Sequence, residues 1–151
     1  MRVITGCARG RRLETLEGED VRPTTDRIKE AIFSIIQFET EGRAFLDLFA
    51  GSGQMGIEAL SRGAKTAYFV DNSKKSLDTV KRNLKTTKLE QNAKTFAMDY
   101  QSFLAMCSER FDIAFLDPPY KTGILQKSLE LVPEIMNETG VIIAENPLDE
   151  E

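Results

Sequence analysis

Hydrophobic and polar positions along the chain predict strands separated by helices. Short apolar runs rich in β-branched and aromatic residues predict strands at 44–49, 66–70, 94–98, 111–116 and 140–145. Between these runs, apolar positions at helical spacing predict helices at about 55–62, at 74–88, near Phe103 and Leu104, and at 125–136. Pro133 is expected to break or kink the last helix. The alternation predicts an α/β fold with a doubly wound, mainly parallel sheet.

The first residues differ from this pattern and predict an N-terminal arm. Residues 1–22 resemble short β pieces broken by glycines and are too polar to form a core by themselves. An amphipathic helix is expected from Asp26 to about Glu39, after start signals at Pro23 and the following threonines, with its apolar positions at Ile28, Ile32, Ile35 and Ile36. We therefore expect an arm at 1–24 and one domain at 25–151.

Composition narrows the possible chemistry. The 151 residues, 41% of them hydrophobic, suffice for a single core, and no apolar run approaches the ~20 residues of a membrane span. The start lacks the apolar region of a secretory signal, so we expect a cytoplasmic protein. The chain has no histidine, and Cys7 and Cys107 are not at metal-ligand spacing. No metal site is expected, and chemistry must use carboxylates, backbone groups, Tyr, Lys or a cofactor.

The charge is unevenly distributed along the chain. The net charge is −4, yet residues 1–12 contain four arginines and no acid. This pattern indicates either a local basic arm on an acidic body or an ordinary solvated surface.

A glycine-rich turn follows the first predicted strand. Gly51 to Gly56 match the dinucleotide fingerprint G-x-G-x-x-G, and Asp71 lies twenty residues past Gly51, as in NAD sites. A glycine turn needed only for tight packing is the alternative. Asp47, at the end of the same strand, favours the cationic S-adenosylmethionine, because a carboxylate opposes a pyrophosphate. Asp71 can accept hydrogen bonds from both ribose hydroxyls, whereas Asp99 either takes the adenine amino group or caps a helix.

The fourth strand ends in Asp117-Pro118-Pro119-Tyr120. With the strand order 3-2-1-4-5, this segment and the glycine turn face one crevice at the carboxyl ends of the strands. The prolines remove two backbone donors and leave acceptors in a stiff frame, which suits the exocyclic NH2 of a nucleobase. Asp117 and the Pro118 carbonyl would hold that amine, and Tyr120 would stack on the base. The alternative is a rigid turn with a capping Asp and a packed Tyr.

These residues resemble known motifs. Asp47 to Gly53 with Asp117 to Tyr120 are similar to motifs I and IV of the class I S-adenosylmethionine-dependent amino-methyltransferases. MRVITGCARGRRL and VRPTTDRIKEAIFSII, at 1–13 and 21–36, resemble the bacterial 16S rRNA guanine-N2 methyltransferase family. The resemblance implies methyl transfer from S-adenosylmethionine to guanine N2 by a protein, expected to be a monomer, that acts on 16S rRNA or the assembled small ribosomal subunit.

The resemblance also implies residue roles. The residues implied to bind the cofactor are Asp47, Phe49, Gly51, Ser52, Gly53, Asp71, Asn72 and Asp99. Those implied to hold the target guanine are Asp117, Pro118, Pro119 and Tyr120. Those implied to contact RNA phosphates are Arg9, Arg11, Arg12, Arg22 and Arg27, with the alternative that Arg22 caps or braces the first helix.

The end of the chain departs from this family. Members of the class usually add an antiparallel hairpin after strand five, but the chain stops six residues past Glu145, so we expect that hairpin to be absent. Three other functions stay open: a DNA adenine-N6 methyltransferase, an NAD-dependent oxidoreductase, and a non-catalytic RNA-binding module. The Asp117 to Tyr120 motif does not separate guanine from adenine, since both bases present the same NH2 geometry.

Overall fold

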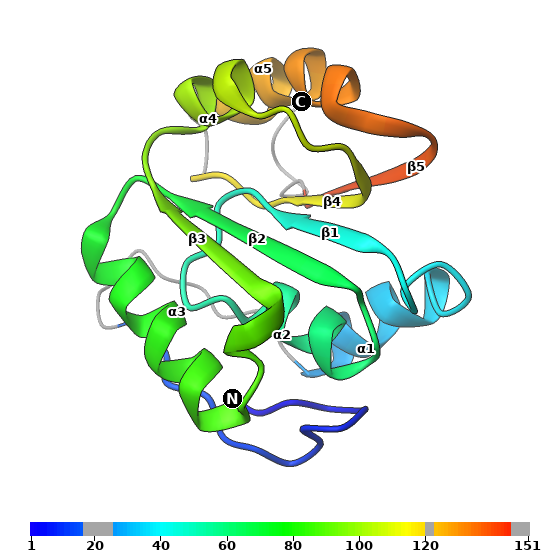
Figure 1. The fold of residues 1–151 in the computed structure, drawn as a ribbon, viewed down its shortest axis with the longest axis vertical. Coiled ribbons are helices and arrows are strands. Elements are labelled where there is room, and N and C mark those ends of the chain that lie inside the picture. The colour runs from blue at the N-terminus through cyan, green and yellow to red at the C-terminus, as the bar shows by residue number, and fades with distance from the viewer. Residues whose placement is uncertain (17–25, 120–122, 146–151) are drawn as a thin grey trace.

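The computed structural model describes residues 1–16, 26–119 and 123–145. Within these ranges, five strands form one sheet of order β3-β2-β1-β4-β5 (Figure 1). The strands are β1 Ala44–Asp47, β2 Thr66–Asp71, β3 Ala93–Ala97, β4 Phe111–Leu116 and β5 Met136–Ala144. Every neighbouring pair is parallel. This arrangement confirms the predicted doubly wound α/β fold and strand order.

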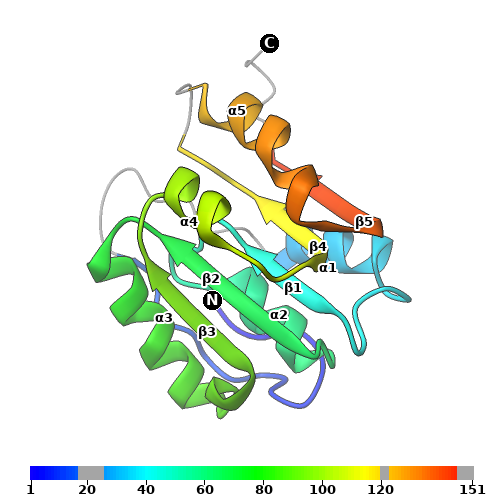
Figure 2. The same cartoon turned by 45° about the horizontal axis from the view of Figure 1, so that its top comes forward.

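Helices cover both faces of the sheet (Figures 1 and 2). They are α1 Asp26–Ile35, α2 Gln54–Ser61, α3 Lys74–Thr87, α4 Tyr100–Met106 and α5 Ile124–Leu131, with short 3-10 turns η1 Glu90–Asn92 and η2 Val132–Ile135. The core side chains of α1, α2 and α3 belong to one cluster, and those of α4 and η2 belong to a second. The sheet separates these two clusters.

The central strands are buried on both faces, as in parallel sheets generally. In β2, Ala67 and Phe69 pack into the first cluster while Tyr68 and Val70 pack into the second. This division follows from the two-residue period of a strand, which points successive side chains to opposite faces. Because β2 has no solvent-facing side, its apolar run is continuous and does not alternate with polar residues.

The last predicted helix is divided at its proline. The structure ends α5 at Leu131 and continues with η2, in which Pro133 lies in the first turn. Proline lacks the backbone N–H of the next helical hydrogen bond and its ring clashes with the preceding turn. The predicted break is therefore confirmed.

The first helix corrects the predicted amphipathic pattern. It ends at Ile35, short of Glu39, and its buried residues are Lys29 and Phe33. Ile28 and Ile35, which were expected on the apolar face, are 42% and 78% exposed. The other two predicted positions are confirmed, because Ile36 is fully buried and Ile32 packs against the core. Lys29 is buried beside them, and its ammonium donates a 2.8 Å hydrogen bond to the Arg2 carbonyl.

Residues 1–16 of the arm do not form a sheet. Their β pairing is a single antiparallel bridge between Arg2 and Arg12. It joins the main core instead, since Val3, Ala8 and Leu13 are buried in the cluster that contains α2 and α3. No helix in the described ranges has the length and apolar character needed to cross a lipid bilayer.

Candidate active site

A cavity of about 580 Å³ opens at the carboxyl ends of the first four strands. Its wall includes the turn after β1, the residues that follow β2, β3 and β4, and part of the arm. Ligands of doubly wound folds bind in this position, where the strand order reverses between β1 and β4. Residues of the wall that sequence analysis singled out are Phe49, Gly51, Ser52, Asp71, Asn72, Asp99, Asp117, Pro118 and Pro119.

The glycine turn brings the backbone to the cavity. Gly51 and Gly53 have φ angles of 59° and 83°, in the left-handed region that favours glycine. The turn is closed by a 2.8 Å hydrogen bond from Gly53 N to the Ala50 carbonyl, and α2 begins at the next residue. Gly51 lines the cavity, whereas Gly53 packs beneath it, where an added Cβ would lie 3.1 Å from Val80.

Gly56, the third glycine of the fingerprint, is needed for packing. A Cβ built at this position would lie 2.4 Å from Cε2 of Phe69 on β2. The interpretation as a packing glycine therefore applies to Gly56, while Gly51 takes part in the cavity wall. One motif thus combines close helix-to-strand contact with an accessible turn.

Asp47 lies behind the turn and does not line the cavity. Its side chain is buried, and its Oδ2 accepts a 3.0 Å hydrogen bond from the Gly56 N–H. Burial raises the pKa of Asp47 to about 8, against the lowering effect of that hydrogen bond, and the charges of Asp117 and Asp71 raise it further. This corrects the argument that placed a negative charge at Asp47, because its carboxyl group is largely protonated at neutral pH.

The negative charge of the cavity comes from other acids. Asp71, Asp99 and Asp117 line it, and no Lys or Arg is among the described residues of its wall. Asp71 accepts 2.9 Å hydrogen bonds from the backbone N–H groups of Gly51 and Ser73. The expected preference for a cationic ligand therefore rests on Asp71, Asp99 and Asp117 and not on Asp47.

Asp99 both caps a helix and faces the cavity. It precedes α4, and its carboxylate accepts the Ser102 N–H at 2.8 Å and the Ser102 hydroxyl at 2.9 Å. The backbone hydrogen bond from Ser102 is the main cause that lowers the pKa of Asp99. The two alternatives considered for this residue are thus compatible, since a carboxylate has more acceptor positions than these two bonds use.

The segment after β4 forms the wall facing the glycine turn. Asp117, Pro118 and Pro119 line the cavity, and Tyr120 lies outside the described residues. Burial raises the pKa of Asp117 to about 7, and the neighbouring Glu145 carboxyl adds to the effect. Asp117 therefore changes protonation state near neutral pH, which is typical of residues that take part in proton transfer.

The arm contributes to the same cavity through Met1, Thr15 and Leu16, which sequence analysis did not single out. The side-chain amide of Asn83 on α3 joins the arm to the glycine turn by donating to the carbonyls of Glu14 and Ser52, at 3.0 and 2.9 Å. Such contacts between distant segments leave no signal in local sequence patterns.

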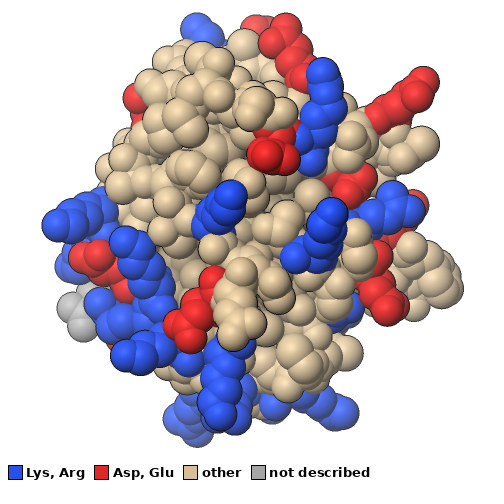
Figure 3. Space-filling model, in the orientation of Figure 1, with Lys and Arg blue, Asp and Glu red and all other residues tan. Residues whose placement is uncertain are grey.

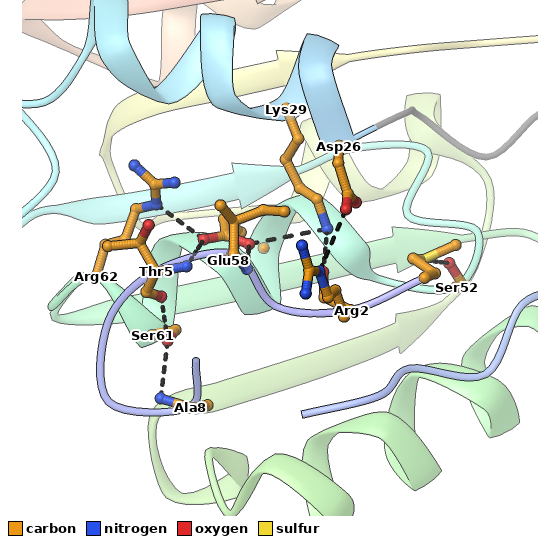
Figure 4. A network of polar contacts seen from close by, with 12 residues as sticks. Arg2, Thr5, Ala8, Asp26, Lys29, Ser52, Glu58, Ser61 and Arg62 are labelled. Atoms are coloured by element: carbon orange, nitrogen blue, oxygen red, sulfur yellow. Dashed lines mark hydrogen bonds and ion pairs between the residues drawn. The ribbon is translucent and has the colours of Figure 1, made fainter. Parts of the chain in front are cut away.

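A buried ionic network fixes the beginning of the arm to the domain (Figure 4). The Glu58 carboxylate on α2 accepts hydrogen bonds from the backbone N–H groups of Ile4 and Thr5, at 2.8 and 3.0 Å. It also pairs with Arg62 at 2.9 Å and with the fully buried Lys29 at 3.8 Å. Burial lowers the pKa of Lys29, and the Glu58 charge opposes that shift.

Basic side chains gather over α3 and along the lower part of the molecule (Figure 3). Arg9, Arg11, Arg12 and Arg27 are exposed, as phosphate contacts require, while Arg22 lies outside the described residues. Sequence analysis missed the outer side of α3, which carries the exposed residues Lys74, Lys75, Lys81, Arg82 and Lys85, with the exposed Lys88 at its C-cap. Positions 74, 81, 85 and 88, and likewise 75 and 82, are separated by seven, four or three residues, which puts them on one side of a helix, and this spacing was the available signal.

Metal chemistry has no candidate site in the described part of the chain. No group of three or more His, Cys, Asp or Glu side chains there is arranged to hold an ion. Cys7 and Cys107 are free thiols.

Comparison with known proteins shows that this chain is similar to proteins named as methyltransferases. A Bacillus subtilis protein provisionally named as an rRNA methyltransferase, YlbH, is 46% identical over 97% of this chain and 82% of its own length. Ribosomal RNA small subunit methyltransferase D of Escherichia coli is 36% identical over 89% of this chain and 67% of its own length. A solved Escherichia coli structure provisionally titled a methyltransferase, yhhF, has a TM-score of 0.89 at 34% identity, covering 99% of this chain and 82% of that one.

The family assignment rests on the whole chain. Residues 1–151 match the family described as Conserved hypothetical protein 95, and relatives at 36–46% identity are named as rRNA methyltransferases. The resemblance suggested by the glycine turn and Asp117-Pro118-Pro119-Tyr120 is confirmed at this level. The chain belongs to the Conserved hypothetical protein 95 family, which is the family of ribosomal RNA small subunit methyltransferase D.

Proposed function

We propose that this protein transfers a methyl group from S-adenosylmethionine to the exocyclic N2 of a guanine in 16S rRNA. The observation that carries the proposal is the cavity wall, which combines a glycine turn, three carboxylates and a proline-framed acceptor, without a basic side chain among its described residues. A ribosomal substrate implies action in the cytoplasm, and we expect the enzyme to work as a monomer.

The residues of the cavity suit this cofactor. S-adenosylmethionine carries an ammonium and a sulfonium group, and when bound it supplies an electrophilic methyl group. Asp71 can accept hydrogen bonds from ribose hydroxyls because each oxygen has a lone pair beyond its bond to Gly51 or Ser73. Asp99 retains acceptor positions for an adenine amino group in the same way. The dinucleotide NAD suits the wall less well, because the acids would oppose its pyrophosphate.

The wall after β4 suits an amine on a planar base. Pro118 and Pro119 have no backbone N–H, so this segment offers acceptors only. Hydrogen bonds from the two amine protons to Asp117 and to the Pro118 carbonyl would direct the nitrogen lone pair toward the cofactor side of the cavity. Positioning of this kind accounts for a large share of catalysis in many enzymes. The base must leave its helix to reach this site, as other base-modifying enzymes require.

The arm and α3 are suited to the RNA backbone. Arg9, Arg11 and Arg12 are exposed, and the arm that carries them is fixed to α2 through Glu58. Phosphate contacts from such residues position a nucleic acid without reading its sequence. The preference for rRNA over DNA therefore rests on the family relationship, and the DNA adenine alternative stays a matter for experiment.

Substitution of Asp117 tests the proposed mechanism. We expect Asp117→Ala to keep its affinity for S-adenosylmethionine in calorimetry and to lose methyl transfer by at least about 100-fold, in the range of a lost acid–base group. The matched control is Asp78→Ala on α3, which removes an acid outside the cavity wall and is expected to retain activity. Full turnover by Asp117→Ala would remove Asp117 from the mechanism. Binding of NADH in place of S-adenosylmethionine would instead support an oxidoreductase.

A further inference from the structure

Glu145 lies directly beside Asp117 at the carboxyl edge of the sheet. In the parallel pair β4 and β5, Leu116 is in register with Ala144. The Glu145 N–H then donates a 3.0 Å hydrogen bond to the Leu116 carbonyl. The residue that follows each strand is therefore an acid, Asp117 after β4 and Glu145 after β5. The two carboxyl groups lie within hydrogen-bonding contact.

Glu145 also contains an unsatisfied buried atom. Its Oε2 is inaccessible to solvent and receives no hydrogen bond from the described residues. A buried oxygen without a hydrogen-bond donor destabilises the folded state, more so when it is charged, so it requires a physical explanation. A hydrogen bond between two carboxyl groups requires that one of them hold a proton, because two carboxylates are acceptors only.

The surroundings favour such a proton. The titratable groups that act on Asp117 are Glu145, just past β5, and Asp47 on β1, which is largely protonated at neutral pH, and Asp71 on β2 acts on Asp47 in turn. All of these groups are acids, and no basic side chain is among the described residues of the cavity wall. Neighbouring carboxyl groups that lack a positive partner retain a shared proton, because both cannot ionise easily.

We propose that Asp117 and Glu145 share one proton, with Asp117 as the residue that contacts the target amine and Glu145 as the residue that positions it. This inference rests on the proposed methyl transfer and adds a residue to it. The shared proton satisfies Glu145 and holds the Asp117 carboxyl group in a fixed orientation. The remaining lone pairs of Asp117 then face the cavity.

The pair also provides a destination for the proton released in the reaction. The amine nitrogen forms a bond to the methyl carbon, the sulfur–carbon bond breaks, and its electron pair stays on sulfur. The nitrogen then carries a positive charge and loses one proton. The singly protonated pair, with a charge of −1, accepts that proton, becomes neutral and later releases it to water. Burial and the Glu145 carboxyl group raise the pKa of Asp117 to about 7, so the pair holds its one shared proton up to about neutral pH.

The test compares Glu145→Gln with the wild type across pH. Gln keeps the shape and can donate a hydrogen bond to Asp117, but it removes the neighbouring charge, so the pKa of Asp117 should fall. Because the wild-type pair loses its shared proton as pH rises through about 7, we expect its single-turnover rate of methyl transfer to fall there. We expect this basic limb to be absent in Glu145→Gln, whose amide donates to Asp117 at every pH. Glu145→Leu should lower the rate by at least about tenfold, with an unchanged Kd for S-adenosylmethionine.

The matched control is Glu138→Gln, an exposed acid on the same strand, which should have the wild-type pH profile. A basic limb that persists unchanged in an active Glu145→Gln enzyme would overturn the inference. A carboxyl-resolved NMR titration gives a second measurement that does not depend on activity. The Asp117 signal should titrate near neutral pH in the wild type and at lower pH in Glu145→Gln. If the wild type methylates no RNA, the proposed function fails, and the titration still decides whether the proton is shared.

Discussion

The Asp71 carboxylate accepts a hydrogen bond from the backbone N–H of Gly51 at 2.9 Å, so the acid that ends β2 supports the turn that follows β1. Its other oxygen accepts the Ser73 N–H at 2.9 Å, at the start of α3. Three segments of the proposed cofactor site are thus connected through one side chain. Asp71 has a structural role here in addition to its proposed contact with ribose.

Replacement of Asp71 should weaken cofactor binding. We expect Asp71→Ala to reduce S-adenosylmethionine affinity by at least about tenfold, since each hydrogen bond to a charged group contributes about 1.5–3 kcal/mol. Calorimetric titration measures the effect, with Asp78→Ala as the charge-matched control on α3. An unchanged Kd would contradict the assignment of Asp71 to the ribose.

Asp47 predicts how stability depends on pH. Its folded pKa of about 8 lies above the ordinary value of 3.8, so the folded protein holds a proton that the unfolded chain releases. The free energy of unfolding should therefore fall as pH rises from about 4 to about 8, by at most about 1.4 kcal/mol per pH unit from this group. Asp117, also raised, acts in the same direction with an upper limit near pH 7.

The variant Asp47→Asn removes the titrating group but keeps an oxygen that can accept the Gly56 N–H. Its free energy of unfolding, measured by urea denaturation at several pH values, should fall less steeply over this range than that of the wild type. Asp78→Asn should leave the slope unchanged. Parallel profiles for Asp47→Asn and the wild type would show that the buried carboxyl group does not titrate as described.

The Glu58 network predicts a large loss of stability. Glu58→Ala leaves the fully buried Lys29 without its ionic partner and leaves the Ile4 and Thr5 N–H groups without an acceptor. Breaking one side of a buried ion pair costs about 3–5 kcal/mol. Urea denaturation should show a loss of this size, whereas the exposed Glu90→Ala should change stability by less than about 0.5 kcal/mol. A small loss for Glu58→Ala would mean that water readily reaches Lys29.

The basic surfaces predict a salt-dependent affinity for RNA. Replacement of Lys74, Lys81 and Lys85 by Gln removes three exposed charges from α3, and replacement of Arg9, Arg11 and Arg12 by Gln removes three from the arm. Each lost phosphate contact should lower the slope of log affinity against log salt by about 0.7–0.9. The control is Lys65→Gln. Lys65 is exposed and precedes β2, so it lies at the amino ends of the strands, whereas the cavity lies at their carboxyl ends. An unchanged slope would exclude the substituted surface from RNA binding.

Patterns local in sequence predicted the fold well. Short continuous apolar runs alternate with segments of helical spacing, and this alternation predicted the parallel sheet, because strands buried on both faces are apolar throughout whereas the helices that cover them are apolar on one side. The break at Pro133 followed equally from the geometry of proline. By contrast, the burial of Lys29 on α1 had no local signal, because its partners, the Arg2 carbonyl and Glu58, are distant in sequence.

The candidate site was predictable only in part. Its position and the contributions of Asp71, Asp99 and Asp117 followed from where strands end. The direction of the Asp47 side chain did not, because position at a strand end does not determine whether a carboxyl group faces the cavity or the helix behind it. Glu145 was missed for a similar reason, since its contact with Asp117 arises from the register of β4 and β5.

The most direct test of the proposed function is the transfer of labelled methyl from S-adenosylmethionine to unmethylated small ribosomal subunits, with naked 16S rRNA and DNA in parallel and nucleoside analysis of the products. We predict N2-methylguanosine from the ribosomal substrates and none from DNA. A protein that binds S-adenosylmethionine but labels only DNA adenine would contradict the rRNA assignment, and one that labels none of the three substrates would contradict catalysis and favour an RNA-binding module.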